Sequence, residues 1–151
     1  MVFVDSFSST VWWVYGGFEA NDELRKSYIG DNWLKAKVRG TPHNTGDGLK
    51  MALEIGAAKH GLYDGCHATP MDLYMKNYGG LDLKPSERKN YRKICYFLGI
   101  MINAKGKRFL DEGKNFRNYT YAQYGKKVLD QPDHFAWQIF DSKVFHLLYQ
   151  E

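Results

Sequence analysis

Arg108, Arg117 and His67 have sequence neighbours that favour proton transfer or the binding of a carboxylate. Arg108 lies in residues 106–112, where basic, aromatic and acidic side chains alternate, and Arg117 follows shortly after. Arginine is ordinarily a poor general acid because its pKa exceeds about 12, but a desolvated guanidinium in a network with carboxylates can pass a proton. A hairpin edge with a solvated face is the alternative explanation. His67, flanked by small residues, has two interpretations as well: a donor to a bound carboxylate, or a structural surface histidine.

Two glycine-containing turns are candidate sites for a polar or anionic ligand. Gly16-Gly17-Phe18 follows an apolar stretch, and glycine there allows a ligand to approach the backbone closely. Thr45-Gly46-Asp47-Gly48 precedes a helical pattern, and the first backbone N–H groups of a helix are free to bind an anion. The alternatives are an ordinary turn and a helix capped by Thr45 or Asp47. A GxGxxG dinucleotide fingerprint does not occur in the sequence.

The elements that must position these groups follow a mixed order of strands and helices. Apolar and turn patterns predict strands at 9–15 and 134–140, and helices at 22–27, 49–60, 120–129 and 142–148. Residues 30–43 are predicted to form a loop, and 62–69 a short extended segment. A hairpin is predicted between 100–102 and 108–110, with its turn at 103–106. This order lacks the strict alternation of a doubly wound sheet and indicates an α+β fold.

Composition restricts the class of protein without selecting a partner. The chain has 151 residues, of which 44% are hydrophobic and 25% charged, and its net charge of +4 comes from 21 basic and 17 acidic residues. These values suit one globular domain, and the dispersed basic residues match no nucleic-acid motif. No apolar run reaches the length of a membrane span. Cys66 and Cys95 lack zinc-ligand spacing, so no metal is expected, and a cytoplasmic location is expected because no signal peptide is recognisable.

The order of several motifs resembles the fumarate reductase/succinate dehydrogenase flavoprotein family, with a pattern typical of its members that oxidise tricarballylate. The segments that carry the resemblance are GGFEAN at 16–21, VRGTPHNTGDGLKMALEIGA at 38–57, GCHATP at 65–70, GIMINAKGKRFLDEGKNFRNYTYAQYG at 99–125 and FAWQIFDSKV at 135–144. The resemblance implies an FAD-dependent dehydrogenase that oxidises a tricarboxylic acid, of the tricarballylate to cis-aconitate type, by hydride transfer to the flavin.

The resemblance also implies a role for individual residues. Gly16, Gly17 and Phe18 would lie against FAD, and the aspartate of the TGDG motif, Asp47, would bind it. His67 would contact a substrate carboxylate. Arg117 would be the proton-transferring residue, although one extra residue separates it from the KRF motif relative to the family pattern.

The resemblance implies only part of such an enzyme. Residues 1–66 would be the C-terminal segment of an FAD-binding domain, and residues 67–151 an incomplete capping and substrate domain. The GxGxxG unit and the family's C-terminal site residues are not found, and Lys93 and Tyr96 stand where some members carry a Glu and Arg proton relay. The expectation is therefore a fragment, or one subunit of a split flavoenzyme completed by a chain with the missing FAD-binding half. A non-enzymatic basic binding module is the alternative class.

Overall fold

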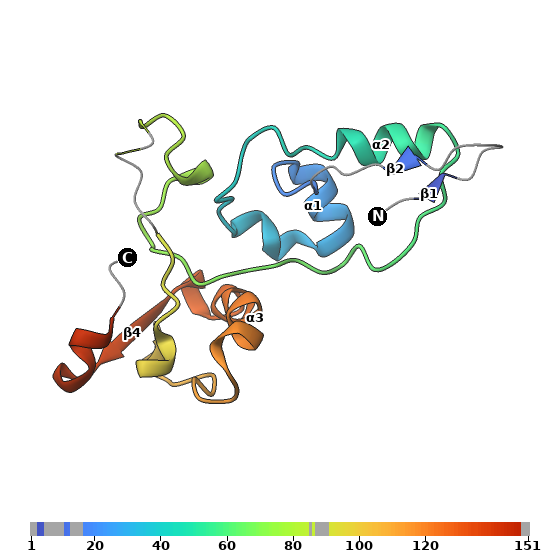
Figure 1. Ribbon diagram of the computed structural model, residues 1–151. Helices are drawn as coiled ribbons and strands as arrows, with labels where there is room; N and C mark the ends of the chain where they lie inside the picture. Colours follow the sequence, from blue (N-terminus) through green and yellow to red (C-terminus); the bar gives the residue numbers. More distant parts are fainter. Residues whose placement is uncertain (1–2, 5–10, 13–16, 85, 87–90, 149–151) are drawn as a thin grey trace.

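The computed structural model describes residues 3–4, 11–12, 17–84, 86 and 91–148 (Figure 1). Its helices are α1 (Asp22–Ile29), α2 (Asp47–Glu54) and α3 (Arg117–Leu129). Its strands are β1 (Phe3–Val4), β2 (Val11–Trp12), β3 (Gly99–Asn103) and β4 (Ala136–Phe140). Short 3-10 helices are η1 (Asp31–Lys35), η2 (Asn77–Gly79), η4 (Tyr96–Leu98), η5 (Pro132–His134) and η6 (Ser142–Leu147). The mixture of helices and antiparallel strand pairs agrees with the α+β class.

Helix α1 forms where the sequence predicts it. The Asn21 side chain accepts a hydrogen bond from the Leu24 amide at 3.0 Å, which caps the first turn. The next segment differs from the prediction, because η1 lies inside the expected loop at 30–43. The buried Arg25 guanidinium donates to the carbonyls of Trp33 and Ala36, and so fixes η1 against α1. A long-range side-chain contact of this kind leaves no local sequence pattern.

Helix α2 starts at the TGDG motif but is shorter than predicted. It ends at Glu54, and the chain turns at Gly56, whose φ is +90°, rather than continuing to Gly61. Neither Thr45 nor Asp47 caps the helix: the residue before it is Gly46, in a left-handed conformation, and the Thr45 hydroxyl donates instead to the Asp47 carboxylate at 2.6 Å.

The larger sheet pairs β3 with β4 in an antiparallel register from Gly99↔Phe140 to Asn103↔Ala136. The predicted hairpin between 100–102 and 108–110 is confirmed only in part, by one antiparallel bridge between Ile102 and Arg108. Its turn at 103–106 does form, with Gly106 at a φ of +70°. The predicted strand at 134–140 is confirmed as β4, which starts at Ala136. Five consecutive pairs join β4 to the other edge of β3.

The hydrophobic core of the described residues lies in the C-terminal half. Ile94, Tyr96, Met101 and Tyr124 are buried together, so that α3 packs on the inner face of the β3–β4 sheet. In Figure 1 this half lies apart from α1 and α2, and an extended segment runs between them. The helix predicted at 120–129 is confirmed, and α3 begins three residues earlier, at Arg117.

The C-terminal segment after β4 has a side-chain N-cap, but its helix type differs from the prediction. The Asp141 side chain accepts a hydrogen bond from the Lys143 amide at 2.8 Å, as expected of an N-cap. The turns that follow form the 3-10 helix η6 rather than an α-helix.

Candidate functional site

The residues expected to lie against a cofactor gather at the start of α2. A Cβ atom on Gly46 would lie 2.7 Å from the Leu24 side chain and 3.0 Å from Cβ of Phe18, so only glycine permits this close approach. The Asn21 side-chain amide donates to the Thr45 carbonyl at 3.0 Å. These contacts place Gly17 and Phe18 beside the TGDG turn, whereas Gly16 lies outside the described residues.

The cofactor-side residues are accessible. Gly17 and Asp47 are exposed, and Phe18 is half-buried against Tyr28, with ring centroids 5.4 Å apart. Beside α2, the helix face that carries Leu49 and Ala52 is buried. The exposed apolar side chains here are Met51 and Ile55, the residue that follows α2.

The second group of candidate residues lies along α3. The His67 and Tyr121 rings meet edge to face, with centroids 5.1 Å apart. Tyr121 is four residues after Arg117 in the same helix, and residues at this spacing share one helix face. The fold therefore brings His67 to the side of α3 that carries Arg117, across a sequence separation of fifty residues.

Gly125 makes this approach possible. The Ala68 amide donates to the Ala122 carbonyl at 2.8 Å, and the Gly125 amide donates to the Ala68 carbonyl at 3.0 Å. A Cβ atom on Gly125 would lie 2.5 Å from the carbonyl carbon and oxygen of Ala68. The segment that carries His67 thus crosses α3 at backbone contact distance, which only glycine at position 125 permits.

The first turn of α3 is held by two buried hydroxyl groups. The Tyr96 and Thr120 hydroxyls lie 2.6 Å apart, and one of them donates to the other. The hydroxyl that accepts this bond can donate its own proton to the Arg117 carbonyl, which lies 3.4 Å from the Tyr96 hydroxyl and 3.2 Å from that of Thr120. Burial raises the pKa of Tyr96. The half-buried Arg117 side chain donates to the Asn118 side-chain oxygen at 3.1 and 3.3 Å. Its backbone is therefore anchored while its guanidinium lies toward the surface.

Arg108 forms the acid–base pair that the alternating pattern suggested. Its guanidinium makes a two-point contact with one carboxylate oxygen of Glu112, which is 2% exposed, and the other oxygen accepts from the Met101 amide at 2.5 Å. Burial would raise the pKa of Glu112, but the hydrogen bonds from Arg108 and the Met101 amide outweigh it and hold that pKa below its usual range. This ionised pair ties the 106–112 segment to β3.

Cys66, the residue before His67, has a shifted pKa. Burial, followed by the nearby charge of Glu19, raises the pKa of the Cys66 thiol, while the charge of Arg25 acts in the opposite direction. The thiol next to His67 therefore lies within the electrostatic range of the segment that follows Phe18. A protonated thiol is a poor nucleophile.

The described residues contain no cluster of three or more histidine, cysteine, aspartate or glutamate side chains that could hold a metal ion. No described helix is both long and apolar enough to cross a membrane. Sequence reasoning missed Tyr121, Gly125 and the Tyr96–Thr120 pair. A glycine inside a helical pattern was the one available signal, because glycine weakens a helix unless close packing requires it.

Comparison with known proteins finds relatives among dehydrogenases. The chain is 29% identical over 132 residues to the 3-oxosteroid 1-dehydrogenase of Mycobacterium tuberculosis, and 29% identical over 136 residues to that of Mycolicibacterium smegmatis. Each match includes 85% of this chain but only 22% and 21% of the relative. No family model matches the chain, and no solved structure matches it. The chain thus spans about a fifth of the length of the curated relatives it matches, and the similarity supports a distant relationship to oxidoreductases of the dehydrogenase type. It does not extend to tricarballylate.

Proposed function

We propose that this chain is part of an FAD-dependent dehydrogenase that oxidises a tricarboxylic acid such as tricarballylate. Residues 1–66 would contribute to the FAD-binding domain and residues 67–151 to the capping domain that holds the substrate. The observation that carries the proposal is the approach of His67 to the Arg117 face of α3. The similarity to dehydrogenases supports it independently.

The cofactor-side residues fit the polar, non-phosphate part of such a cofactor. Asp47 is an exposed acceptor, so it suits hydroxyl donors and would repel a phosphate. Gly16 and Gly17 would let the cofactor approach the backbone, and Phe18 would cover it. When bound, FAD supplies the hydride acceptor, and the surrounding side chains supply orientation and charge.

His67 and Arg117 would act on the substrate rather than on the cofactor. His67 would donate a hydrogen bond to one carboxylate and so fix the reacting carbons. Arg117 would accept the proton lost from the substrate as a neutral guanidine, having first given up its own proton to water as the closing site desolvates it. The guanidinium formed by that step would then neutralise a second carboxylate. The anchored Arg117 backbone limits the positions that its side chain can reach.

Measurements of flavin retention and turnover test this proposal. The chain is purified alone, and also co-expressed with the polypeptides encoded on either side of it; each sample is then incubated with FAD and tricarballylate. We expect weak flavin binding by the chain alone, and flavin-linked oxidation only in the completed assembly. Asp47→Ala should reduce flavin retention, while exposed Asp64→Ala should not. Full turnover by the isolated chain would contradict the assignment to a partial enzyme, and a flavin-free assembly would contradict the cofactor.

A 3-oxosteroid is the second candidate substrate, because the relatives act on that class according to their names. The site favours the tricarboxylic acid, since His67 and Arg117 both suit anions and a steroid carries no carboxylate. Turnover of a 3-oxosteroid without turnover of tricarballylate in the completed assembly would reverse this choice.

A further inference from the structure

We infer that Tyr121 is a third substrate-contacting side chain, whose hydroxyl donates a hydrogen bond to a carboxylate oxygen of an anion held between His67 and Arg117. The inference rests on the proposed function, because it assumes that these two residues bind a polycarboxylate. It adds a residue that the sequence motifs do not single out.

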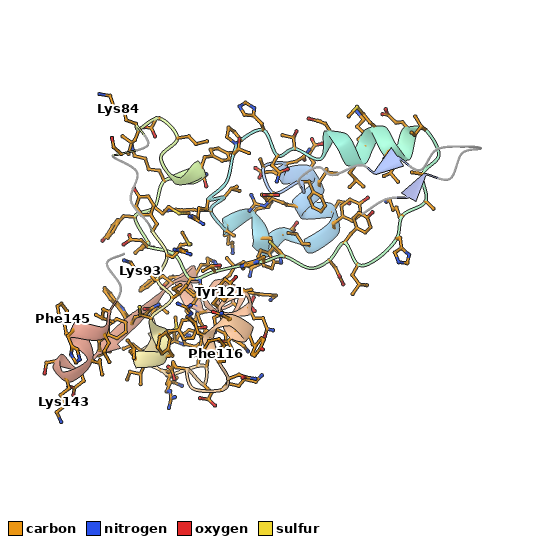
Figure 2. The ribbon with its side chains drawn as sticks, viewed as in Figure 1. Lys84, Lys93, Phe116, Tyr121, Lys143 and Phe145 are labelled. Atoms are coloured by element: carbon orange, nitrogen blue, oxygen red, sulfur yellow. The ribbon has the colours of Figure 1, made fainter. Side chains whose placement is uncertain are left out.

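The position of Tyr121 carries the first part of the argument. Its ring lies against His67 with a centroid distance of 5.1 Å, and it projects from α3 one helical turn after Arg117. Figure 2 labels Tyr121 on the side of α3 nearer the extended segment, and Phe116, the residue before α3, farther from it. An anion that contacts both His67 and Arg117 must therefore pass beside Tyr121.

The hydrogen-bonding state of the local tyrosines carries the second part. The buried Tyr96 hydroxyl bonds to Thr120, and the buried Tyr124 hydroxyl donates to the Asp111 carbonyl at 2.5 Å. Within the described part of the chain, the Tyr121 hydroxyl has no such partner, although its ring is half-buried against the core. Because the residue is only half-buried, this unpartnered hydroxyl is available to a ligand.

The chemistry of a phenol suits this position. A tyrosine hydroxyl donates one hydrogen bond without adding charge, and a carboxylate has lone pairs for several donors. Packing against His67 and the core already fixes the Tyr121 ring, so little side-chain entropy is lost when the hydroxyl engages an anion. His67, Arg117 and Tyr121 together offer three directed donors along one helix face.

A binding titration with matched variants tests the inference. The full chain is titrated with tricarballylate and, separately, with its uncharged triamide, and the His67 imidazole signals are followed by NMR. Tyr121→Phe keeps the ring and removes only the hydroxyl; it should weaken tricarballylate binding about tenfold. Tyr119→Phe, on the same helix but 71% exposed, is the control and should leave binding unchanged. Thermal unfolding of both variants checks that each is folded.

The outcomes distinguish the role of Tyr121 from the proposed binding of a polycarboxylate by His67 and Arg117. Equal affinities of the wild-type chain and Tyr121→Phe would overturn the role of Tyr121 and leave the proposed function standing. Equal weakening in the Tyr119→Phe control would overturn it too, because the effect would not be specific to position 121. Failure of the wild-type chain to bind tricarballylate, or equal binding of the triamide, would overturn the anion site itself and this inference with it.

Discussion

At the scale of single residues, the most constrained charged group is Glu112. Its carboxylate is enclosed, yet the Arg108 guanidinium and the Met101 amide satisfy both of its oxygens. A buried carboxylate stays ionised only when such donors offset the loss of hydration. Glu112 therefore links the 106–112 segment, which the sequence singled out for possible chemistry, to the strand beneath it. Its role in the described structure is positional.

Stability should depend on Glu112 in a defined pH range. Its folded-state pKa lies below the unfolded value of about 4.3, so the stabilisation is fully present above that value and is lost as the pH falls through the folded-state pKa. Glu112→Gln should lower the free energy of unfolding at pH 7 by about 1 kcal/mol, a figure reduced for the solvent screening of Arg108. Urea unfolding at pH 7 and at pH 3 measures the difference, which should shrink at pH 3.

Glu54→Gln is the matched control, because Glu54 is exposed and lies 3.9 Å from Lys50 in a surface pair. Surface pairs of this kind contribute little. A pH-independent deficit in Glu112→Gln would show that shape, rather than charge, accounts for the role of Glu112.

At the scale of elements, the crossing of the 67–69 segment over α3 decides whether a site exists. Two main-chain hydrogen bonds connect Ala68 to Ala122 and Gly125, and they align His67 with the helix face of Tyr121 and Arg117. The helix itself follows from its local sequence. The crossing does not, because it depends on one glycine meeting a segment more than fifty residues earlier.

Gly125→Ala should therefore destabilise the chain, although alanine is the better helix former by about 1 kcal/mol. The added Cβ would meet the backbone of Ala68, which cannot rotate away, so we expect a net loss of about 1–3 kcal/mol in urea unfolding. The ring-current shift that Tyr121 imposes on His67 should fall as the segment moves. Gly113→Ala, where the nearest atom would be 3.7 Å away, should leave both measurements unchanged. A more stable Gly125→Ala variant would refute the crossing.

At the scale of the whole molecule, the chain exposes more surface than its mass requires. Its accessible surface is 10,716 Å², whereas a folded monomer of this mass is expected to expose about 7,900 Å². Part of the excess is apolar: Ile100 opposes Ile139 across the outer face of the β3–β4 sheet, next to Trp137, and these three side chains are 43%, 46% and 59% exposed. Such a face is typical of an interaction surface. It suits the proposal that a complementary polypeptide completes the enzyme.

The outer face of the sheet should bind a hydrophobic dye. We expect the purified chain to enhance the fluorescence of anilinonaphthalene sulfonate, and the double variant Trp137→Gln/Ile139→Thr to lose most of that enhancement. Leu62→Thr removes an even more exposed but separate side chain, so it should lose little. If the wild-type chain does not enhance the fluorescence of the dye, this face is covered in solution. Analytical sedimentation would then show whether a second copy of the chain covers it.

The sequence by itself determined the features that depend on neighbouring residues. The cap at Asn21, the start of α2, the glycine turn at 103–106, helix α3 and strand β4 all follow from local propensity and turn chemistry. The similarity of the chain to dehydrogenases likewise agrees with the class of protein that its motifs suggested.

Only the tertiary structure decided which of these parts meet. The pairing of β3 with β4 and the crossing at Gly125 join residues far apart in the chain. The Arg25 contacts that hold η1 join residues eight and eleven positions apart. Each of these segments could pair with a neighbouring or a distant part of the chain. Buried hydrogen bonds and packing, rather than the local sequence pattern, determine which partner it has. The arrangement of His67, Tyr121 and Arg117 along one helix face results from this choice between partners.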